Sequence, residues 1–228
     1  MLDKLKQRVY QANMDLVSHG LVIHTWGNVS GRDPESGLVV IKPSGVSYEK
    51  MKPEDMVILD IDGEIIEGKK KPSTDTPTHL ILYRAFRNIG GLVHTHSTYA
   101  TSWAQAGKNI PPFGTTHADH FYGDVPCTRK LEGKEIKKDY ESNTGKVIIE
   151  TIGKGDPMVI NSVLVNCHGP FSWGKDAEEA VYNAVALEEI ARMAFYTVLL
   201  GRKDPVDQDL LDKHFLRKHG KDAYYGQK

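Results

Sequence analysis

The sequence predicts an α/β fold in which a central mixed or antiparallel β-sheet is flanked by helices. Short apolar runs typical of buried strands are interspersed with longer segments of helical periodicity. The two kinds of segment do not alternate strictly, which argues against a purely parallel sheet. The length of 228 residues fits one domain, and no repeat or linker divides the chain. We therefore expect a single domain over residues 1–228.

Helices are predicted from apolar spacing and from the residues at their ends. Pro77 has the position that proline prefers in the first turn of a helix. Asp176 and Glu179 have the spacing of a capping box, which marks the start of a long helix. The expected helices are 2–19, 76–90, 97–107, 144–152, 176–200 and 206–219.

Strands are predicted where short apolar runs end at turn-forming residues. Asp62-Gly63 is a hairpin signal between two such runs. The expected strands are 37–41, 56–61, 64–66, 91–96 and 162–167.

Composition excludes several classes of function. The formal net charge is −1 with acidic and basic residues interspersed, so we expect no nucleic-acid partner. Cys127 and Cys167 are the only cysteines, which is too few for a disulfide framework. The N-terminal segment is charged and lacks the apolar stretch of a signal peptide, and no run is long enough to span a bilayer. We therefore expect a cytoplasmic protein without a membrane partner.

His94 and His96 stand at the end of the predicted strand 91–96. Because side chains alternate along a strand, the two imidazoles should point to the same face. A second apolar run, 162–167, ends directly before His168. Two such strand ends can place three imidazoles around one divalent cation and leave a coordination position open, as in catalytic zinc sites. The alternative is a set of hydrogen-bonded surface histidines, which is the common case for a lone histidine at a strand end.

Three short polar loops have the composition of an anion-binding site. Loop amides, hydroxyl groups and a lysine can cradle a phosphate, and the third loop precedes a predicted helix N-terminus, which favours anions. An ordinary polar turn is the alternative for each loop taken alone, and the spacing does not show that the loops converge. The candidate residues are Gly27, Asn28, Lys42, Ser44, Gly45, Ser73 and Thr74.

Two carboxylates and a tyrosine pair complete the set of candidates. An acid at the position of Asp75, before the helix 76–90, usually interacts with the helix N-terminus, although beside a metal it can ligate or move a proton. Asp119 lies in a polar loop, where a lone carboxylate is usually solvated. Tyr224 and Tyr225 are unusual for a free tail, so the tail should pack on its own domain or reach a neighbouring chain.

Taken together, these motifs resemble the class II aldolase/adducin family and, within it, the sugar-phosphate 4-epimerases. The resemblance covers nearly the whole chain, and the motifs occur in the same order. Thr74 stands where a second serine is expected, and its hydroxyl preserves the hydrogen bond. The segments that carry the resemblance are 25–30, 41–46, 73–79, 93–97, 114–119, 168–171 and 223–227.

The resemblance implies a role for the candidates around the metal. His94, His96 and His168 match the zinc-binding histidines of the family. Asp75 matches an acid at the metal that marks the epimerases, since the related aldolases carry glutamate there. The three polar loops match the loops that bind the substrate and its phosphate.

The resemblance also implies which residues transfer protons. Asp119 and Tyr225 match the acid/base pair, with the tyrosine supplied by an adjacent subunit. His214 matches a histidine that lines the same shared site. The implied assembly is a homotetramer around a fourfold axis, with active sites shared between subunits.

The implied reaction is a metal-dependent inversion of C4 of L-ribulose 5-phosphate, which gives D-xylulose 5-phosphate. Cleavage of the C3–C4 bond, rotation of the aldehyde fragment and re-formation of the bond would achieve it. Zn²⁺ is the expected cofactor, although imidazole and carboxylate ligands also suit Mn²⁺ and Co²⁺. Two alternatives stay open: a class II aldolase that releases its fragments, and a metal-free module similar to the adducin head. Asp75 and the tyrosine tail argue against the first, and the three histidines argue against the second.

Overall fold

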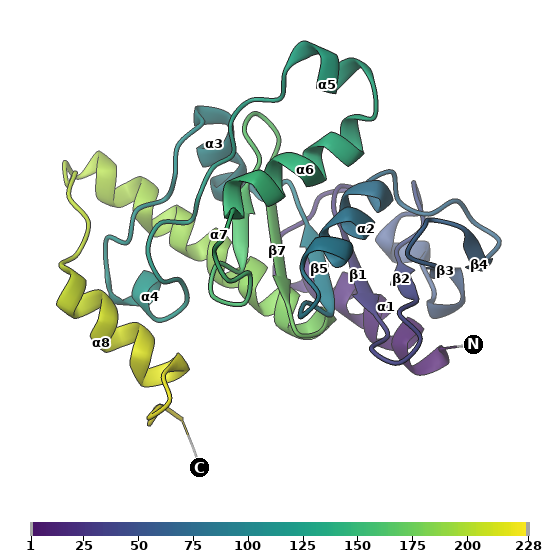
Figure 1. Ribbon diagram of the computed structural model, residues 1–228, viewed down its shortest axis with the longest axis horizontal. Helices are drawn as coiled ribbons and strands as arrows, with labels where there is room; N and C mark the ends of the chain where they lie inside the picture. Colours follow the sequence, from purple (N-terminus) through teal and green to yellow (C-terminus); the bar gives the residue numbers. More distant parts are fainter. Residues whose placement is uncertain (1, 227–228) are drawn as a thin grey trace.

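The computed structural model describes residues 2–226, and its centre is a seven-stranded sheet of order β4-β3-β2-β1-β5-β7-β6 (Figure 1). All the neighbouring strands pair antiparallel. The predicted α/β class is therefore confirmed, with the sheet in its antiparallel form. The strands are β1 (Asn28–Arg32), β2 (Val39–Ile41), β3 (Val57–Leu59), β4 (Ile65–Glu67), β5 (Gly91–His94), β6 (Ser162–Leu164) and β7 (Pro170–Gly174).

Helices flank the sheet on both sides. Within residues 2–226, no helix is both long enough and apolar enough to cross a membrane. The helices are α1 (Asp3–Ser18), α2 (Thr76–Ala85), α3 (Thr98–Ala106), α4 (Thr115–Ala118), α5 (Gly133–Lys137), α6 (Tyr140–Ile152), α7 (Ala177–Leu199) and α8 (Gln208–His219), with short 3-10 turns at Tyr48–Lys50 and Pro53–Asp55.

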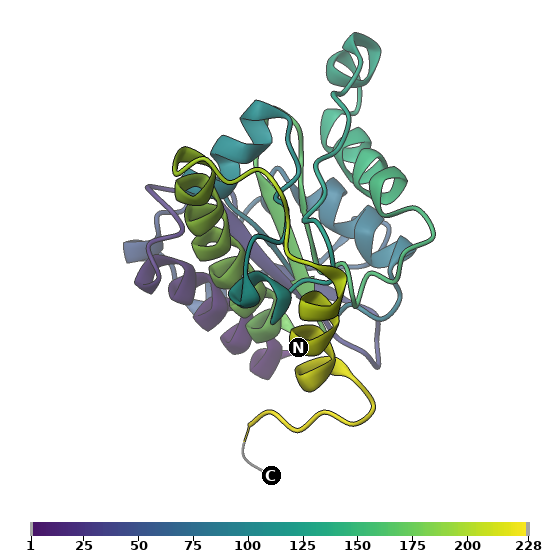
Figure 2. The same cartoon turned by 90° about the vertical axis from the view of Figure 1, so that its left-hand side faces the viewer.

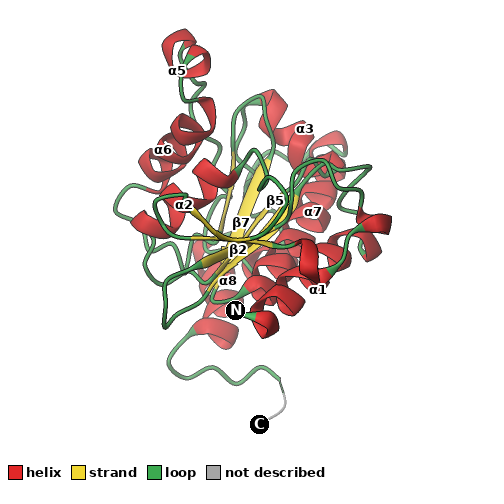
Figure 3. Cartoon of the chain, turned by 90° about the vertical axis from the view of Figure 1, so that its right-hand side faces the viewer, coloured by secondary structure: helices red, strands yellow, loops and turns green. Residues whose placement is uncertain are grey.

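The two faces of the sheet carry separate apolar cores. Side chains alternate along β2 and β5, so Val40 and Val93 face the core under α1 and α7. Val39 and Leu92 face the opposite core, under α2 and α6. Figures 2 and 3 show these helix pairs on opposite sides of the sheet. The central strands are thereby covered on both faces, which fixes the register in which they pair.

Most predicted helices are confirmed, and the exceptions have local causes. Asp176 caps α7 as expected, because its side chain accepts a hydrogen bond from the Glu179 amide at 2.8 Å. Ser97 precedes α3 but makes no capping hydrogen bond. The prediction for the helix 144–152 was wrong at its start, since α6 begins at Tyr140. Two strands, β1 and β7, and two helices, α4 and α5, were not predicted. Polar residues and a leading proline disguise the strands, and the helices are only 4 and 5 residues long.

One edge of the sheet gathers the ends of its central strands. β1 begins at Asn28, which pairs with His94 at the end of β5, and His94 also pairs with Phe171 in β7. β2 and β5 both pair antiparallel with β1, so they run in the same direction and end at this edge. Lys42 follows β2 there, and His168 precedes β7. This edge therefore collects the candidate residues from four strands.

The start of β5 needs glycine, which gives a prediction for stability. A Cβ at Gly91 would lie 2.2 Å from the backbone oxygen of Asp176, so the N-terminus of α7 would have to move. We expect Gly91→Ala to lower the free energy of unfolding by roughly 3 kcal/mol or more. Thermal unfolding followed by circular dichroism should show a loss of at least about 6 °C.

Gly133→Ala is the matched control, because a Cβ at that position in α5 meets nothing within 4 Å. The control should leave the midpoint unchanged or raise it slightly. Equal midpoints for the two variants would contradict the close approach of β5 to α7.

Candidate metal and phosphate site

Three imidazoles converge at the sheet edge just described. The nitrogens of His94, His96 and His168 that could ligate a metal all lie within 4.8 Å of one another. The Nε2 atoms of His94 and His96 are 3.2 Å apart. β5 ends at His94, so His96 lies two residues beyond the strand rather than on it. The two rings nevertheless meet, as strand alternation predicts, with their centroids 4.9 Å apart.

Hydrogen bonding and burial make these histidines suitable ligands for a cation. The Nδ1 atom of His94 contacts the Pro170 carbonyl oxygen at 3.0 Å. A carbonyl only accepts, so Nδ1 carries the proton and Nε2 keeps its lone pair for a metal. Burial, reinforced by His94 and His96, lowers the pKa of His168 to about 3. Burial also lowers the pKa of His96. Neutral imidazole is the form that binds a metal, so the donor set fits a divalent cation.

Asp75 faces the histidines rather than the helix that it precedes. It stands at the N-cap position of α2, but its side chain makes no capping hydrogen bond. It accepts instead from Nδ2 of Asn28 at 2.7 Å. Burial alone would raise the pKa of Asp75, but His94, His79 and the bond from Asn28 outweigh it and lower the pKa. Among the described residues, the group whose ligand atoms lie within 4.8 Å of one another contains the three histidines and not Asp75, so a metal-ligating role for this charged carboxylate stays a prediction.

The three polar loops line the same cavity as the histidines. The cavity has a volume of about 550 Å³ and opens at the strand ends. The loops therefore converge, which their spacing in the sequence could not show. The predicted residues on its wall are Gly27, Asn28, Lys42, Ser44, Gly45, Ser73, Thr74, Asp75, His94, His96 and His168.

Two residues of these loops have local environments that set how the loops meet the cavity. Lys42 is only 2 % exposed, its Nζ donates to the Val46 carbonyl at 3.1 Å, and burial lowers its pKa to about 8. Gly27 has a φ of +96°, and a Cβ there would lie 2.8 Å from the His94 carbonyl oxygen. Only glycine lets this loop approach the metal site so closely.

The cavity wall includes residues that sequence reasoning missed. Tyr140 and Glu141 lie on it, at the start of α6. They were missed because the helix was predicted to begin only at residue 144. The Tyr140 hydroxyl lies 3.3 Å from Nδ1 of His168. Trp26 is half-exposed on the same wall, with its ring centroid 6.5 Å from that of His96.

The predicted proton-transfer residues form a second cluster, which does not line this cavity. Asp119, which follows α4, accepts two hydrogen bonds from the Arg217 guanidinium, at 3.0 and 2.7 Å. His214 lies 3.1 Å from the same carboxylate. The Arg217 guanidinium also lies 5.2 Å from the ring centroid of Tyr225, so the cluster extends to the tail. Sequence reasoning missed Arg217, which contacts both Asp119 and Tyr225. Gln227, the last residue of the tail motif, lies outside the described residues.

The second cluster is separated from the histidines within one chain. The His120 ring, next to Asp119, packs against Tyr182 in the early turns of α7, with centroids 5.5 Å apart. Figure 1 shows α4 and α8 together at the left, well apart from α2, which begins at the cavity. Burial favours protonated Asp119, but Arg217 and His214 outweigh it and lower the pKa. The cluster thus presents a charged carboxylate and an exposed tyrosine away from the chain's own histidines.

The chain is similar to known proteins in both sequence and fold. The chain is 59 % identical, over the full length of both chains, to L-ribulose-5-phosphate 4-epimerase UlaF of Salmonella paratyphi B and of Salmonella typhi. A solved L-fuculose 1-phosphate aldolase superposes with a TM-score of 0.79 at 26 % identity, covering 92 % of this chain and 94 % of that one.

A more distant structure shares the fold. YgbL of Klebsiella pneumoniae, described as a putative aldolase/epimerase/decarboxylase, superposes with a TM-score of 0.70 at 24 % identity, covering 93 % of this chain and 99 % of that one. The model of the Class II Aldolase and Adducin N-terminal domain matches residues 7–195. The chain belongs to the class II aldolase/adducin family.

Proposed function

We propose that the protein is a divalent-metal-dependent epimerase that converts L-ribulose 5-phosphate to D-xylulose 5-phosphate. The observation that carries this proposal is the 59 % identity, over the full length, to curated enzymes of that name. A cavity lined by three histidines, an aspartate and three phosphate-type loops supports it. We further propose that residues 1–228 form one catalytic domain; a cytoplasmic setting stays a prediction.

The chemistry of the substrate explains why such a cavity is needed. C4 bears no acidic hydrogen, so simple deprotonation cannot invert it, whereas cleavage of the C3–C4 bond can. A divalent cation held by the three histidines would supply Lewis acidity for the negative charge that cleavage leaves on the C1–C3 fragment. Zn²⁺, Mn²⁺ and Co²⁺ all suit imidazole and carboxylate donors.

The loops would keep the second fragment, glycolaldehyde phosphate, in place. Lys42, Ser44 and the hydroxyls of Ser73 and Thr74 can hold the phosphate, while the short carbon chain stays free to rotate. Rotation presents the other face of the aldehyde to the C3 carbanion, and bond formation then gives the inverted centre. Tight binding of the phosphate therefore favours epimerisation, because it keeps the fragment in the cavity until the bond forms again.

Asp119 and Tyr225 would transfer protons to and from the C4 oxygen. One residue would serve the substrate configuration at C4 and the other would serve the product configuration. Because their cluster lies away from the histidines of its own chain, we propose that it enters the cavity of a neighbouring subunit in a cyclic assembly, a tetramer. Arg217 links the aspartate to the tyrosine, so both groups would come from the same neighbour. This arrangement differs from the sequence-based expectation, in which only the tyrosine crossed between subunits.

An aldolase that releases its fragments is the second candidate, favoured by the likeness to L-fuculose 1-phosphate aldolase. Incubation with L-ribulose 5-phosphate, followed by ¹³C NMR, separates the two. We expect D-xylulose 5-phosphate. Free dihydroxyacetone and glycolaldehyde phosphate as the main products would indicate the aldolase instead, and no turnover with Zn²⁺, Mn²⁺ or Co²⁺ would contradict both.

The histidine cluster gives the first prediction for the site. His96→Asn removes one of three protein nitrogens, so we expect a substoichiometric metal content after dialysis and a loss of turnover. Thermal unfolding of the metal-free protein should be unchanged. Metal analysis of the purified variant checks this, and full occupancy with normal turnover would remove His96 from the site.

Lys42 predicts a pH dependence of phosphate binding. Its pKa is lowered to about 8, so the ammonium loses its proton as the pH rises through that value. The charged form attracts phosphate. Inorganic phosphate itself gains a negative charge as the pH rises to neutrality, so the effect of Lys42 is read above that range, where the affinity should fall as the pH passes about 8. Calorimetric titration at several pH values measures it.

Lys42→Met is the control for this assignment. It should bind phosphate weakly at every pH, with no inflection near pH 8. An unchanged inflection in Lys42→Met would mean that another group titrates.

The division of residues between chains predicts which mutants complement each other. His96→Asn and Asp119→Asn are denatured, mixed in equal amounts and refolded into hybrid oligomers. A site is intact only if its histidines come from an Asp119→Asn chain and its aspartate comes from a neighbouring His96→Asn chain. Each condition is met with a chance of about one half, so about a quarter of the sites are intact. We expect about a quarter of wild-type activity. Asp119→Asn mixed with Tyr225→Phe should give no recovery, because every donor chain carries a defect in its cluster.

Native mass spectrometry confirms that hybrids form. Recovery in the second mixture would show that the aspartate and the tyrosine of one site come from different chains. Lack of recovery in the first mixture would place His96 and Asp119 of one site on a single chain.

A further inference from the structure

Tyr140 is a polar residue of the metal cavity to which the reaction described above gives no task. Its hydroxyl lies 3.3 Å from Nδ1 of His168, and its ring centroid lies 6.0 Å from that of His168. We propose that Tyr140 is a positioning residue for the metal site: its hydroxyl oxygen accepts a hydrogen bond from Nδ1–H of His168 and thereby directs Nε2 of His168 toward His94 and His96.

The contact resembles the one that fixes His94. The Pro170 carbonyl oxygen accepts a hydrogen bond from Nδ1 of His94, which leaves Nε2 free to bind the metal. Metal-ligating histidines usually donate their second ring N–H to an oxygen, and this bond sets both the tautomer and the ring orientation. Within residues 2–226, the Tyr140 hydroxyl is the hydrogen-bond partner found for the His168 ring. Removing it should leave His168 free to rotate and to change tautomer.

Tyr140 can do this only if the start of α6 is held in place. Thr78 is buried in α2, and its hydroxyl donates to the Glu141 carbonyl at 2.6 Å. Gly145, one turn further along α6, lets the helices approach closely, since a Cβ there would lie 3.0 Å from the Ile81 side chain. α2 begins beside Asp75, so the same helix that follows the carboxylate also anchors Tyr140. The buried contacts therefore hold Tyr140 and Asp75 as one unit.

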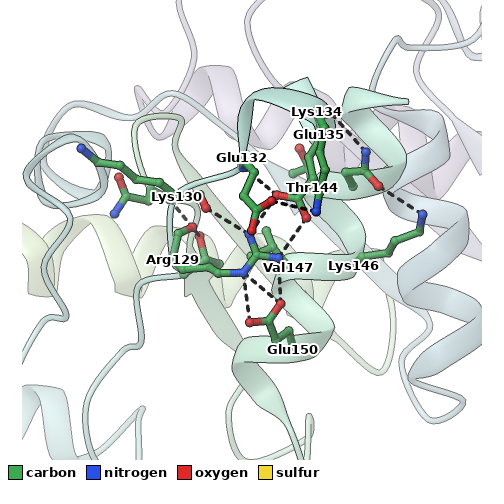
Figure 4. A network of polar contacts seen from close by, with 12 residues as sticks. Arg129, Lys130, Glu132, Lys134, Glu135, Thr144, Lys146, Val147 and Glu150 are labelled. Atoms are coloured by element: carbon green, nitrogen blue, oxygen red, sulfur yellow. Dashed lines mark hydrogen bonds and ion pairs between the residues drawn. The ribbon is translucent and has the colours of Figure 1, made fainter. Parts of the chain in front are cut away.

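An ion-pair network on the outer side of α6 is the other possible anchor. Figure 4 shows Arg129 between Glu135 of α5 and Glu150 of α6, with N–O distances of 2.9 Å to each. The Arg129 side chain is 40 % exposed, and ion pairs at such exposed positions contribute little to stability because water screens them. We therefore assign the anchoring to the buried Thr78 contact and use Arg129 as a control.

The test is the affinity of the full-length protein for Co²⁺ and Zn²⁺. Tyr140→Phe keeps the ring and removes only the hydroxyl. Loss of such a bond typically costs about 10–100-fold in metal affinity, so we expect the dissociation constants to rise at least about tenfold. The visible absorption of the Co²⁺ form should also change in shape, because the geometry of one ligand changes. Arg129→Met, and Tyr122→Phe, which removes a tyrosine hydroxyl that binds Asp212 outside the cavity, should leave both measurements unchanged.

The outcomes separate this inference from the proposed function on which it rests. If the wild-type protein binds Co²⁺ and Tyr140→Phe binds it with the same affinity and spectrum, the positioning role is overturned and the metal site stands. A wild-type protein with no affinity for either cation would overturn both. A rise in the Michaelis constant for the sugar phosphate, with unchanged metal affinity, would make Tyr140 a wall residue for substrate and would also overturn the inference.

Discussion

The antiparallel pairing of β5 with both β1 and β7 is the constraint on which the site depends. It places the end of β5 beside the start of each neighbour, so that Asn28, His94 and the turn that carries His168 meet at one edge. The pairing is fixed because Leu92 and Val93 bury their side chains on opposite faces. A shift of one residue would exchange those faces and move His94 away from the edge. The apolar core therefore sets the geometry of a polar site.

Regular apolar periodicity made most of the helices predictable. The strands that contain buried polar residues were not predicted. β1 reads as a polar turn because Ser30 is buried without being apolar. Its hydroxyl lies 2.7 Å from Nδ1 of His79 and 2.8 Å from the Tyr83 hydroxyl. Such a network replaces the hydration that a polar strand residue loses on burial. No hydropathy pattern reveals it, since the partners are about 50 positions away in the chain.

The candidate residues were found by type, but their grouping required the fold. Three loops separated by up to about 45 positions line one cavity, because β1, β2 and α2 reach the same edge of the sheet. Arg217 was missed because a surface arginine in a helix has no distinctive signal. Only the packing of α8 on α4 reveals that it holds Asp119. Tyr140 was missed because α6 starts one turn earlier than the apolar spacing indicates.

The separation of the two clusters has a consequence for how activity depends on assembly. The histidines are fixed by the central strands, where local unfolding is least frequent. Tyr225 lies on an exposed tail, and Asp119 is held largely by charged side chains from α8. A single chain can therefore bring the three histidines together while the proposed proton-transfer residues face away from them. If those groups act only in a neighbour's cavity, metal binding needs one folded chain and turnover needs two, so dilution that separates the subunits should abolish turnover before it reduces metal content.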